Sequence, residues 1–184
     1  IISTSATGAV NRANFSTQPV IEVQDDYGNV VTTATDSVTV TISDATLTDS
    51  GSATVSKTIN AVNGVATFSN LSKYGTIATS KTLSYASNLL TGTSQTFTLL
   101  NGVPTQLAVV TKPTTARSGL TIGNSVVELR DQDGNPVVTG DGSDAPVVVT
   151  ATRVSDSVTR TLGGTTTVNA VAGQATFTDL SLNE

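Results

Sequence analysis

The clearest chemical spacing in the sequence is a short run of oxygen-bearing side chains, Asp131-Gln132-Asp133-Gly134-Asn135. Asp131, Asp133 and Asn135 stand at alternating positions, a spacing that calcium loops use because a hard cation needs several oxygens converging from one tight bend. A hairpin turn requires the same residue types on backbone grounds alone. Because the distal glutamate of a calcium loop is absent, we favour the turn, with no cofactor, and keep calcium as the alternative.

The chain has few residues of the types that other catalytic or binding sites need. There is no histidine and no cysteine, so catalysis would depend on carboxylate pairs or on an activated serine, threonine or lysine. The aspartates fall in predicted turns without a partner from elsewhere, and we predict that the protein is not an enzyme. Lys57, Lys73 and Lys81 suggest a lysine–asparagine isopeptide crosslink, but no spacing selects a pair, so solvated lysines are predicted. Carbohydrate binding is disfavoured because tryptophan is absent.

The acidic run belongs to a tandem repeat. Residues 20–29 return as residues 126–135 after an interval of 106, and residues 60–72 return as residues 169–181 after an interval of 109. The difference predicts a net insertion of three residues, which we place at 140–144. Such self-similarity indicates repeated structural units. We predict a first repeat at 1–100, a linker at 101–106 and a second repeat at 107–184, with Ile1 aligned to Leu107.

The second repeat is predicted to be incomplete at its C-terminal end, as part of a longer array. Glu184 aligns with Gly75, so residues 76–100 have no counterpart. We therefore expect an open sheet near Phe177 and Leu180, which either further chain or a strand donated by another molecule would cover. The short linker carries Pro104 and predicts a semi-rigid end-to-end connection.

Composition limits the possible partners and favours β-structure. Threonine, valine and serine dominate, charged residues make up 12% and aromatic residues 4%. Residues with branched β-carbons favour strands. The formal net charge of −5 argues against a nucleic-acid partner, which needs clustered lysine and arginine. No apolar run has the length of a membrane span, so we predict no membrane insertion by these residues.

A two-residue period in hydrophobicity predicts half-buried antiparallel strands. Ile21 and Val23 alternate with polar neighbours, and Phe68 does so in a later run. At the position of Val65 the second repeat has Gln174, which predicts a surface position. The seven strands expected in the first repeat lie near 1–5, 20–25, 38–43, 56–62, 65–70, 79–86 and 94–99. Seven short strands separated by turn residues predict tandem immunoglobulin-like β-sandwich domains with Greek-key antiparallel sheets, and a closed barrel is the alternative.

Two motifs carry a family resemblance, and each occurs twice in the same order: V-x-E-V-x-D-x-x-G-N-x-V near residue 20 and A-V-x-G-x-A-T-F-x-x-L-S near residue 61. They resemble the bacterial immunoglobulin-like (Big, invasin and intimin type) tandem repeats. The resemblance implies an extracellular protein at the bacterial cell surface, in which these units are stalk spacers of an adhesin-like protein and contact neighbouring repeats of the same polypeptide. The alternative is a subunit of a self-assembling filament or surface layer, which would also contact other copies.

Overall fold

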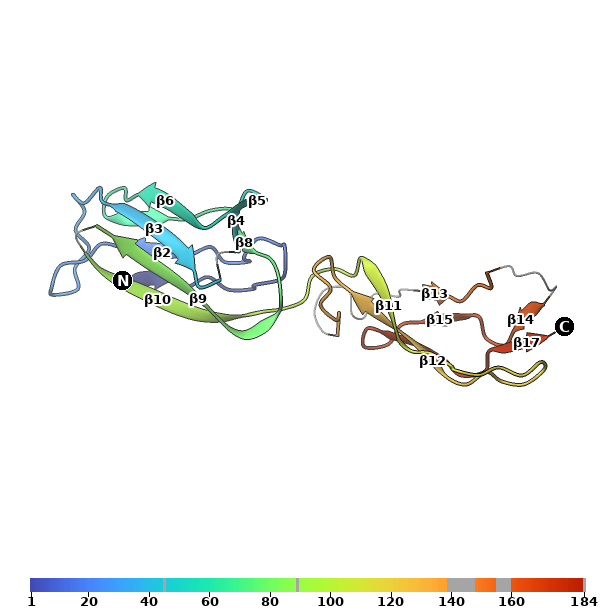
Figure 1. Cartoon of the computed structure of the whole chain (residues 1–184). Helices are drawn as coiled ribbons and strands as arrows, with labels where there is room; N and C mark the ends of the chain where they lie inside the picture. Colours follow the sequence, from blue (N-terminus) through green and yellow to red (C-terminus); the bar gives the residue numbers. More distant parts are fainter. Residues whose placement is uncertain (45, 89, 139–147, 155–159, 184) are drawn as a thin grey trace. The chain divides into compact units, whose positions relative to one another are not determined.

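The computed structural model describes residues 1–44, 46–88, 90–138, 148–154 and 160–183, and within these ranges it contains β-strands and no helix (Figure 1). The chain divides into two compact units, Ile1–Leu100 (unit 1) and Asn101–Glu184 (unit 2). Residues 101–106 lie with unit 2, whose first strand begins at Gln106. The inserted segment predicted at 140–144 lies outside the described residues.

Unit 1 is a β-sandwich. Its strands are β1 (Ile2–Thr4), β2 (Val20–Glu22), β3 (Ser37–Ile42), β4 (Leu47–Asp49), β5 (Ser52–Thr54), β6 (Ser56–Asn60), β7 (Val65–Thr67), β8 (Leu71–Lys73), β9 (Ala78–Ser87) and β10 (Leu90–Leu99). One sheet has the order β1-β2-β7, the facing sheet β10-β9-β3-β6, and a small third sheet β5-β4-β8. The chain crosses between the two main sheets from β2 to β3 and from β6 to β7, which is the connectivity of an immunoglobulin-like sandwich.

All seven predicted strands of the first repeat are present in unit 1, with ends that differ by a few residues. Three strands were not predicted, namely β4, β5 and β8. Each of these has three residues, and their segments mix apolar and polar residues without a sustained two-residue period.

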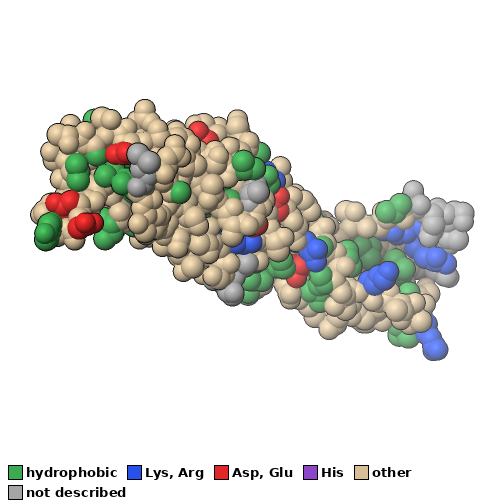
Figure 2. All heavy atoms as spheres, turned by 60° about the vertical axis from the view of Figure 1, so that its left-hand side comes forward, with side chains coloured by type: hydrophobic (Ala, Val, Ile, Leu, Met, Phe, Trp, Pro, Cys, Tyr) green, Lys and Arg blue, Asp and Glu red, His purple; other side chains and the backbone are tan. Residues whose placement is uncertain are grey.

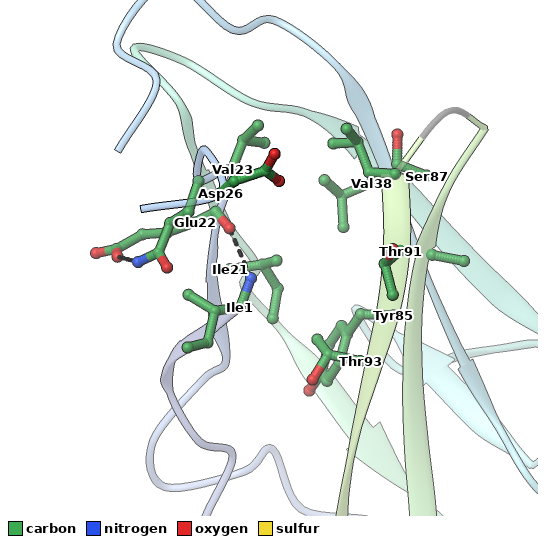
Figure 3. Close-up of a pocket in the computed structure, with 13 residues that line it drawn as sticks. Ile1, Ile21, Glu22, Val23, Asp26, Val38, Tyr85, Ser87, Thr91 and Thr93 are labelled. Carbon is green, nitrogen blue, oxygen red and sulfur yellow. Dashed lines mark hydrogen bonds between the residues drawn. The ribbon is translucent and has the colours of Figure 1, made fainter. Parts of the chain in front are cut away.

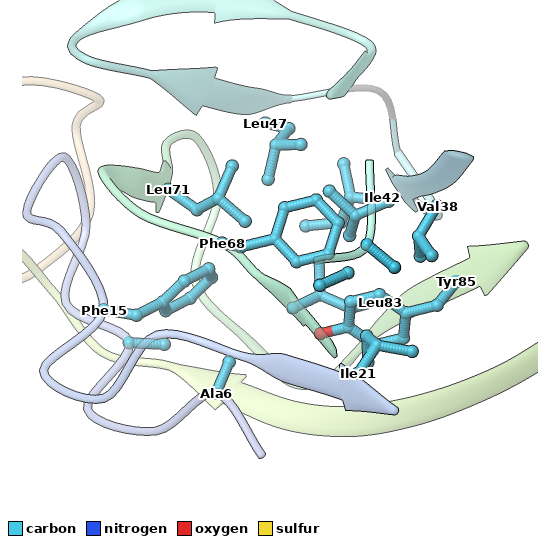
Figure 4. Close-up of a cluster of buried hydrophobic side chains, with 14 of the residues drawn as sticks. Ala6, Phe15, Ile21, Val38, Ile42, Leu47, Phe68, Leu71, Leu83 and Tyr85 are labelled. Atoms are coloured by element: carbon cyan, nitrogen blue, oxygen red, sulfur yellow. The ribbon is translucent and has the colours of Figure 1, made fainter. Parts of the chain in front are cut away.

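The core of unit 1 lies between the facing sheets and confirms the predicted strand phase. Phe68 is 1% exposed and packs beside Tyr85, with ring centroids 6.0 Å apart (Figure 4). Val65, on the opposite face of β7, is only half-buried. The predicted inward residues Ile21, Val23, Val38, Val40, Ile42, Ala66, Phe68 and Leu71 are all buried. The agreement follows from the pleat of a strand, which places alternate side chains on opposite faces.

The turns predicted at Asn63-Gly64 and Ala172-Gly173 are two-residue hairpins. Both residues of each turn have positive φ, which is the geometry of a type I′ turn. In unit 1, Val62 and Val65 exchange main-chain hydrogen bonds of 2.9 and 3.0 Å across the turn. A Cβ atom at Gly173 would lie 1.9 Å from the carbonyl oxygen of Val137, so glycine is required there by space as well as by φ.

Unit 2 repeats the first sheet of unit 1. Its strands are β11 (Gln106–Thr111), β12 (Ser125–Arg130), β13 (Val148–Thr150), β14 (Thr161–Gly163), β15 (Thr167–Asn169), β16 (Gln174–Phe177) and β17 (Ser181–Asn183). The sheets have the orders β11-β12-β16, β13-β15 and β14-β17. Among the described residues, no strand of unit 2 corresponds to β9 or β10.

Strand pairing corrects the predicted alignment at the start of the repeat by one residue. Ile1 exchanges main-chain hydrogen bonds with Glu22, whereas the partner of the corresponding Glu128 is Ala108. Ile1 therefore corresponds to Ala108 and not to Leu107. The sequences of β1 and β11 share no motif that could have set their register.

The predicted position of the open sheet in unit 2 is wrong. Phe177 and Leu180 are 2% and 5% exposed, because they pack into a small core with Leu129, Val137 and Val149. The exposed apolar residues of unit 2 include two on β11, where Leu107 and Val109 are 60% and 65% exposed. Their pairing partners on β12 are Leu129 and Val127, which belong to the core, so Leu107 and Val109 project from the core side of the sheet.

Candidate functional site

The acidic run at Asp131 forms a tight turn that is closed by its own carboxylate. Oδ1 of Asp131 accepts hydrogen bonds from the main-chain N–H groups of Asp133 and Asn135, both at 3.0 Å, and from the side-chain amide of Asn135. Oδ2 accepts from that same amide at 2.9 Å and from the N–H of Gly102 at 3.0 Å. The carboxylate therefore faces N–H donors on both oxygens, an environment that opposes a cation. This geometry supports the turn interpretation over calcium.

The corresponding turn in unit 1 has the same internal bonds. Oδ1 of Asp25 accepts from the N–H groups of Tyr27 and Asn29 at 2.9 Å, and Oδ2 accepts from the Asn29 amide at 3.1 Å. The main-chain hydrogen bond from Asn29 contributes most to lowering the pKa of Asp25, and the Asn29 side chain adds to it. One difference remains: Asp25 and Asn29 are exposed, whereas Asp131 and Asn135 are buried.

We predict that Asp131 contributes to stability and binds no calcium. Replacing Asp131 with alanine should lower the free energy of unfolding of unit 2 by about 1–3 kcal/mol, because several N–H groups lose their acceptor. We expect calcium to leave the thermal midpoint of the unaltered protein unchanged, because we expect it not to bind. A ligand that binds the native state would raise this midpoint by mass action. Gln132→Ala in the same turn is the control for Asp131→Ala, because that side chain is exposed. A calcium-dependent rise in the midpoint would contradict the prediction.

The structure places one of the three lysines in the interior of unit 1. The side chain of Lys73 on β8 is 1% exposed, and its Nζ atom lies 3.0 Å from Oδ2 of Asp44. Lys81 on β9 contacts the same oxygen at 2.7 Å. Lys73 also donates to the carbonyl oxygen of Tyr74 at 2.7 Å and to the hydroxyl of Thr46. The prediction of solvated lysines is therefore wrong for Lys73, and we call the group Asp44, Thr46, Lys73 and Lys81 the lysine cluster.

The lysine cluster is arranged as an ion-pair network, with the ammonium groups of Lys73 and Lys81 on one oxygen of Asp44. Burial alone would raise the pKa of Asp44, but hydrogen bonds from Lys81, Thr46 and Lys73 and the charge of Lys73 lower it well below its ordinary value. Asp44 is therefore an ionised carboxylate held by two ammonium groups. The third lysine, Lys57, pairs separately with Asp49 at 2.7 Å.

A sequence signal for the lysine cluster existed in the repeat itself. Lys73 corresponds to Leu182, because the N–H of Arg12 bonds to the carbonyl oxygen of Lys73 as the N–H of Gly119 bonds to that of Leu182. A position that holds lysine in one repeat and leucine in the other is typical of a partly buried site. The partner Asp44 could not have been selected, because the β4–β8 pairing that brings the two segments together was not predicted.

The described residues contain no other group that resembles a binding site for a metal or a sugar. No three histidine, cysteine, aspartate or glutamate side chains within the described ranges are grouped so that they could hold a metal ion. The tyrosines are dispersed: Tyr85 is buried, Tyr27 is 91% exposed, and Tyr74 lies under the guanidinium of Arg12, which is 5.2 Å from the ring centroid. These rings do not form the shared platform that carbohydrate binding would need.

The surface carries few charges. On the face shown in Figure 2, most of the surface consists of uncharged atoms, with basic and acidic side chains scattered among them. Within the described part of the chain there is no helix with the length and apolar character of a membrane span. These features provide no recognisable surface for a polyanion on the face in view.

Comparisons with known proteins give little similarity. No family model matches this sequence, and no curated protein matches it. A solved structure of surface layer protein SbsC, domains 4–9, is 15% identical over 97% of this chain and 26% of that chain, with a TM-score of 0.33. A second structure, of S-layer protein SbsC, domains 5–6, is 13% identical over 100% of this chain and 94% of that chain, also with a TM-score of 0.33.

These similarities assign neither a fold family nor a function. The chain spans about a quarter of the length of the first SbsC structure. The resemblance to the bacterial immunoglobulin-like family, which no family model supports, stays a prediction. The class of protein is defined by the fold itself, as an all-β protein built from two similar units.

Proposed function

We propose that this chain is a pair of non-catalytic structural repeats of an extracellular bacterial surface protein. The observation that carries the proposal is the attachment of the joining segment. Gly102 donates to Asp131, and Thr105 donates to the carbonyl oxygen of Arg130 at 2.8 Å, so residues 101–106 are folded onto the unit that follows them. An ordered joining segment is expected in repeats that keep a fixed spacing. In a flexible tether, the N–H groups of Gly102 and Thr105 would instead bond to water.

The ionisable groups are used for folding, which supports a non-catalytic role. Asp131 closes a turn, Asp44 and Asp49 pair with lysines, and Asp179 accepts two hydrogen bonds of 2.8 Å from Thr165. The main-chain N–H of Thr165 contributes most to lowering the pKa of Asp179. Carboxylates held in this way stay ionised and satisfied near neutral pH, and they offer no proton to a substrate.

Two functions fit such repeats: a stalk spacer, or a subunit of a surface layer or filament. The exposed apolar residues of β11 favour the assembling subunit. Val109 corresponds to Ile2, which is half-buried against the core of unit 1, yet Val109 is 65% exposed. Leu107 and Val109 thus form an apolar surface on the core side of β11 that no described residue covers. Such a surface is suited to contact with another strand or with another copy of the chain.

We predict that residues 1–184 self-associate through β11. In sedimentation velocity across a concentration series, Leu107→Ser together with Val109→Thr should weaken association by at least about tenfold, since each buried apolar side chain contributes about 1.5 kcal/mol or more. Val171→Thr is the matched control, because Val171 is 75% exposed but lies in the turn between β15 and β16 and not on β11. A monomer at every concentration would favour the stalk spacer, and association that the control variant weakens equally would place the contact elsewhere.

A further inference from the structure

The sequence contains two Asn-Gly pairs, at 63–64 and at 101–102. Such a pair is chemically labile, because glycine has no side chain to hinder ring closure and its backbone adopts many conformations. The glycine nitrogen attacks Cγ of the asparagine, and its proton leaves with the side-chain nitrogen as ammonia. Solvent water then opens the cyclic imide to aspartate or to isoaspartate, and isoaspartate adds one carbon to the main chain.

The second pair lies where unit 1 ends and unit 2 begins. Within unit 1, Leu100 donates to the carbonyl oxygen of Ala9 and accepts from the N–H of Asn11, both at 2.9 Å. Within unit 2, Gly102 donates to Asp131. Isoaspartate at position 101 would therefore lengthen the main chain between the last fixed residue of one unit and the first fixed residue of the next.

The folded chain holds the second pair in an unreactive arrangement. Asn101 is 2% exposed, and Gly102 is also buried, so water has little access to an imide formed there. The N–H of Gly102 donates to Oδ2 of Asp131 at 3.0 Å, and the negative charge of this carboxylate disfavours loss of the proton. The side-chain amide of Asn101 donates to the carbonyl oxygen of Gly102 at 3.2 Å, which fixes the group that would have to leave.

The first pair is held by the main chain instead. Asn63 is exposed, and the N–H of Gly64 donates to the carbonyl oxygen of Ala34 at 3.0 Å. Glu22 lies on the strand beside this turn, but its side chain lines a cavity of about 360 Å³ (Figure 3) and accepts hydrogen bonds from Ser3 and Gln24. Of the two pairs, only the second therefore has its glycine N–H on a carboxylate.

We propose that Asn101 is a deamidation site that the carboxylate of Asp131 keeps unreactive. Asp131 acts as a positioning residue, because by holding the nitrogen of Gly102 it prevents attack on Cγ of Asn101. Release of residues 101–105 from the Asp131 turn exposes the site, and conversion to isoaspartate makes the release permanent, since the lengthened backbone no longer places the N–H of Gly102 on Asp131. The effect on the spacing of the units rests on the proposed function, whereas the protection of Asn101 rests on these contacts alone.

The test incubates residues 1–184 and the variant Asp131→Asn at mildly alkaline pH and measures deamidation at both pairs by peptide mass spectrometry. Asparagine at this position keeps one oxygen for the N–H groups of Asp133 and Asn135, but turns an NH₂ group toward the N–H of Gly102.

In the unaltered chain we expect Asn101 to convert at least about tenfold more slowly than in a free peptide of residues 99–105, because only the locally opened form reacts. In Asp131→Asn the conversion of Asn101 should be at least about tenfold faster than in the unaltered chain. Asn63 is the internal control and should convert at the same rate in both proteins.

A second variant, Val149→Ala, separates the local contact from the stability of unit 2 as a whole. Val149 is 5% exposed in the core of unit 2, and its truncation leaves the carboxylate of Asp131 in place. The two variants are compared at equal free energy of unfolding of unit 2, with urea added to the more stable one. Faster conversion of Asn101 in Asp131→Asn than in Val149→Ala supports the proposal.

Three other results would overturn it: equal acceleration in the two variants, no acceleration in Asp131→Asn, or conversion of Asn101 at the free-peptide rate in the unaltered chain. Amide hydrogen exchange of Gly102 in the unaltered chain tests separately whether the joining segment is ordered, which is the observation on which the proposed function rests. A protected Gly102 with any of these three results overturns the deamidation site and leaves the proposed function intact.

Discussion

Truncation of Phe68 to alanine is expected to lower the free energy of unfolding of unit 1 by about 3–5 kcal/mol, the range measured when large aromatic side chains are removed from well-packed cores. Phe68 is 1% exposed, and the facing sheets hold its ring beside Tyr85. The loss combines the transfer free energy of the ring with the cavity left behind. Denaturant unfolding monitored by hydrogen exchange of unit 1 peptides is the appropriate measurement, because the two units need not unfold together.

The matched control for Phe68→Ala is Val65→Gln on the same strand. Val65 is half-buried on the outer face of β7, and Gln174 occupies the corresponding, exposed position of unit 2. We expect the change to cost less than about 0.5 kcal/mol, as is usual for surface substitutions. A larger effect from Val65→Gln than from Phe68→Ala would mean that the strand phase, and the sandwich with it, is wrong.

Replacement of Asp44 by alanine is expected to have the second largest effect. It leaves Lys73, which is 1% exposed, as a buried ammonium without its counter-charge. Breaking a fully buried pair costs about 3–5 kcal/mol. Because Asp44 is itself 34% exposed, and the neutral acceptors Thr46 and Tyr74 remain, we expect a loss of about 2–3 kcal/mol in unit 1.

The repeat supplies the compensating variant. Lys73→Leu introduces the residue that unit 2 has at Leu182, and we expect it to change stability by less than about 1.5 kcal/mol in either direction, since an apolar side chain removes the charge that needed a partner. Combined with Asp44→Ala it should recover most of the loss. If the double variant is as unstable as the sum of the two single variants, Asp44 and Lys73 do not interact.

The same pair predicts a dependence on pH. The pKa of Asp44 is lower in the folded than in the unfolded state, so its contribution is fully present above the ordinary aspartate range. Protonation of the unfolded state then removes that contribution progressively as the pH falls below about 4–5. The slope of stability against pH in this acid range should be smaller in Asp44→Ala than in the unaltered protein, and equal slopes would contradict the ion pair.

Much of this architecture follows from local pattern. The two-residue period of Ile21, Val23 and Phe68 identified which side chains lie in the core, because the pleat couples sequence parity to the face of a sheet. The Asp-x-x-Gly-Asn turns could be predicted because the bonds that close them lie within five residues. The repeat itself predicted two units, and the composition together with the two-residue period predicted the all-β class.

Other features depended on contacts between distant residues. The strands β4 and β8 are short and partly polar, and only their mutual pairing buries Lys73 beside Asp44. The bond from Gly102 to Asp131 spans 29 residues, and no local pattern relates its two ends. The sequence alone thus determined which residues face the core and where the chain turns, through short-range stereochemistry. Only the tertiary structure decided which charges are buried together and where the joining segment docks, because those choices depend on the packing of strands that are far apart in the chain.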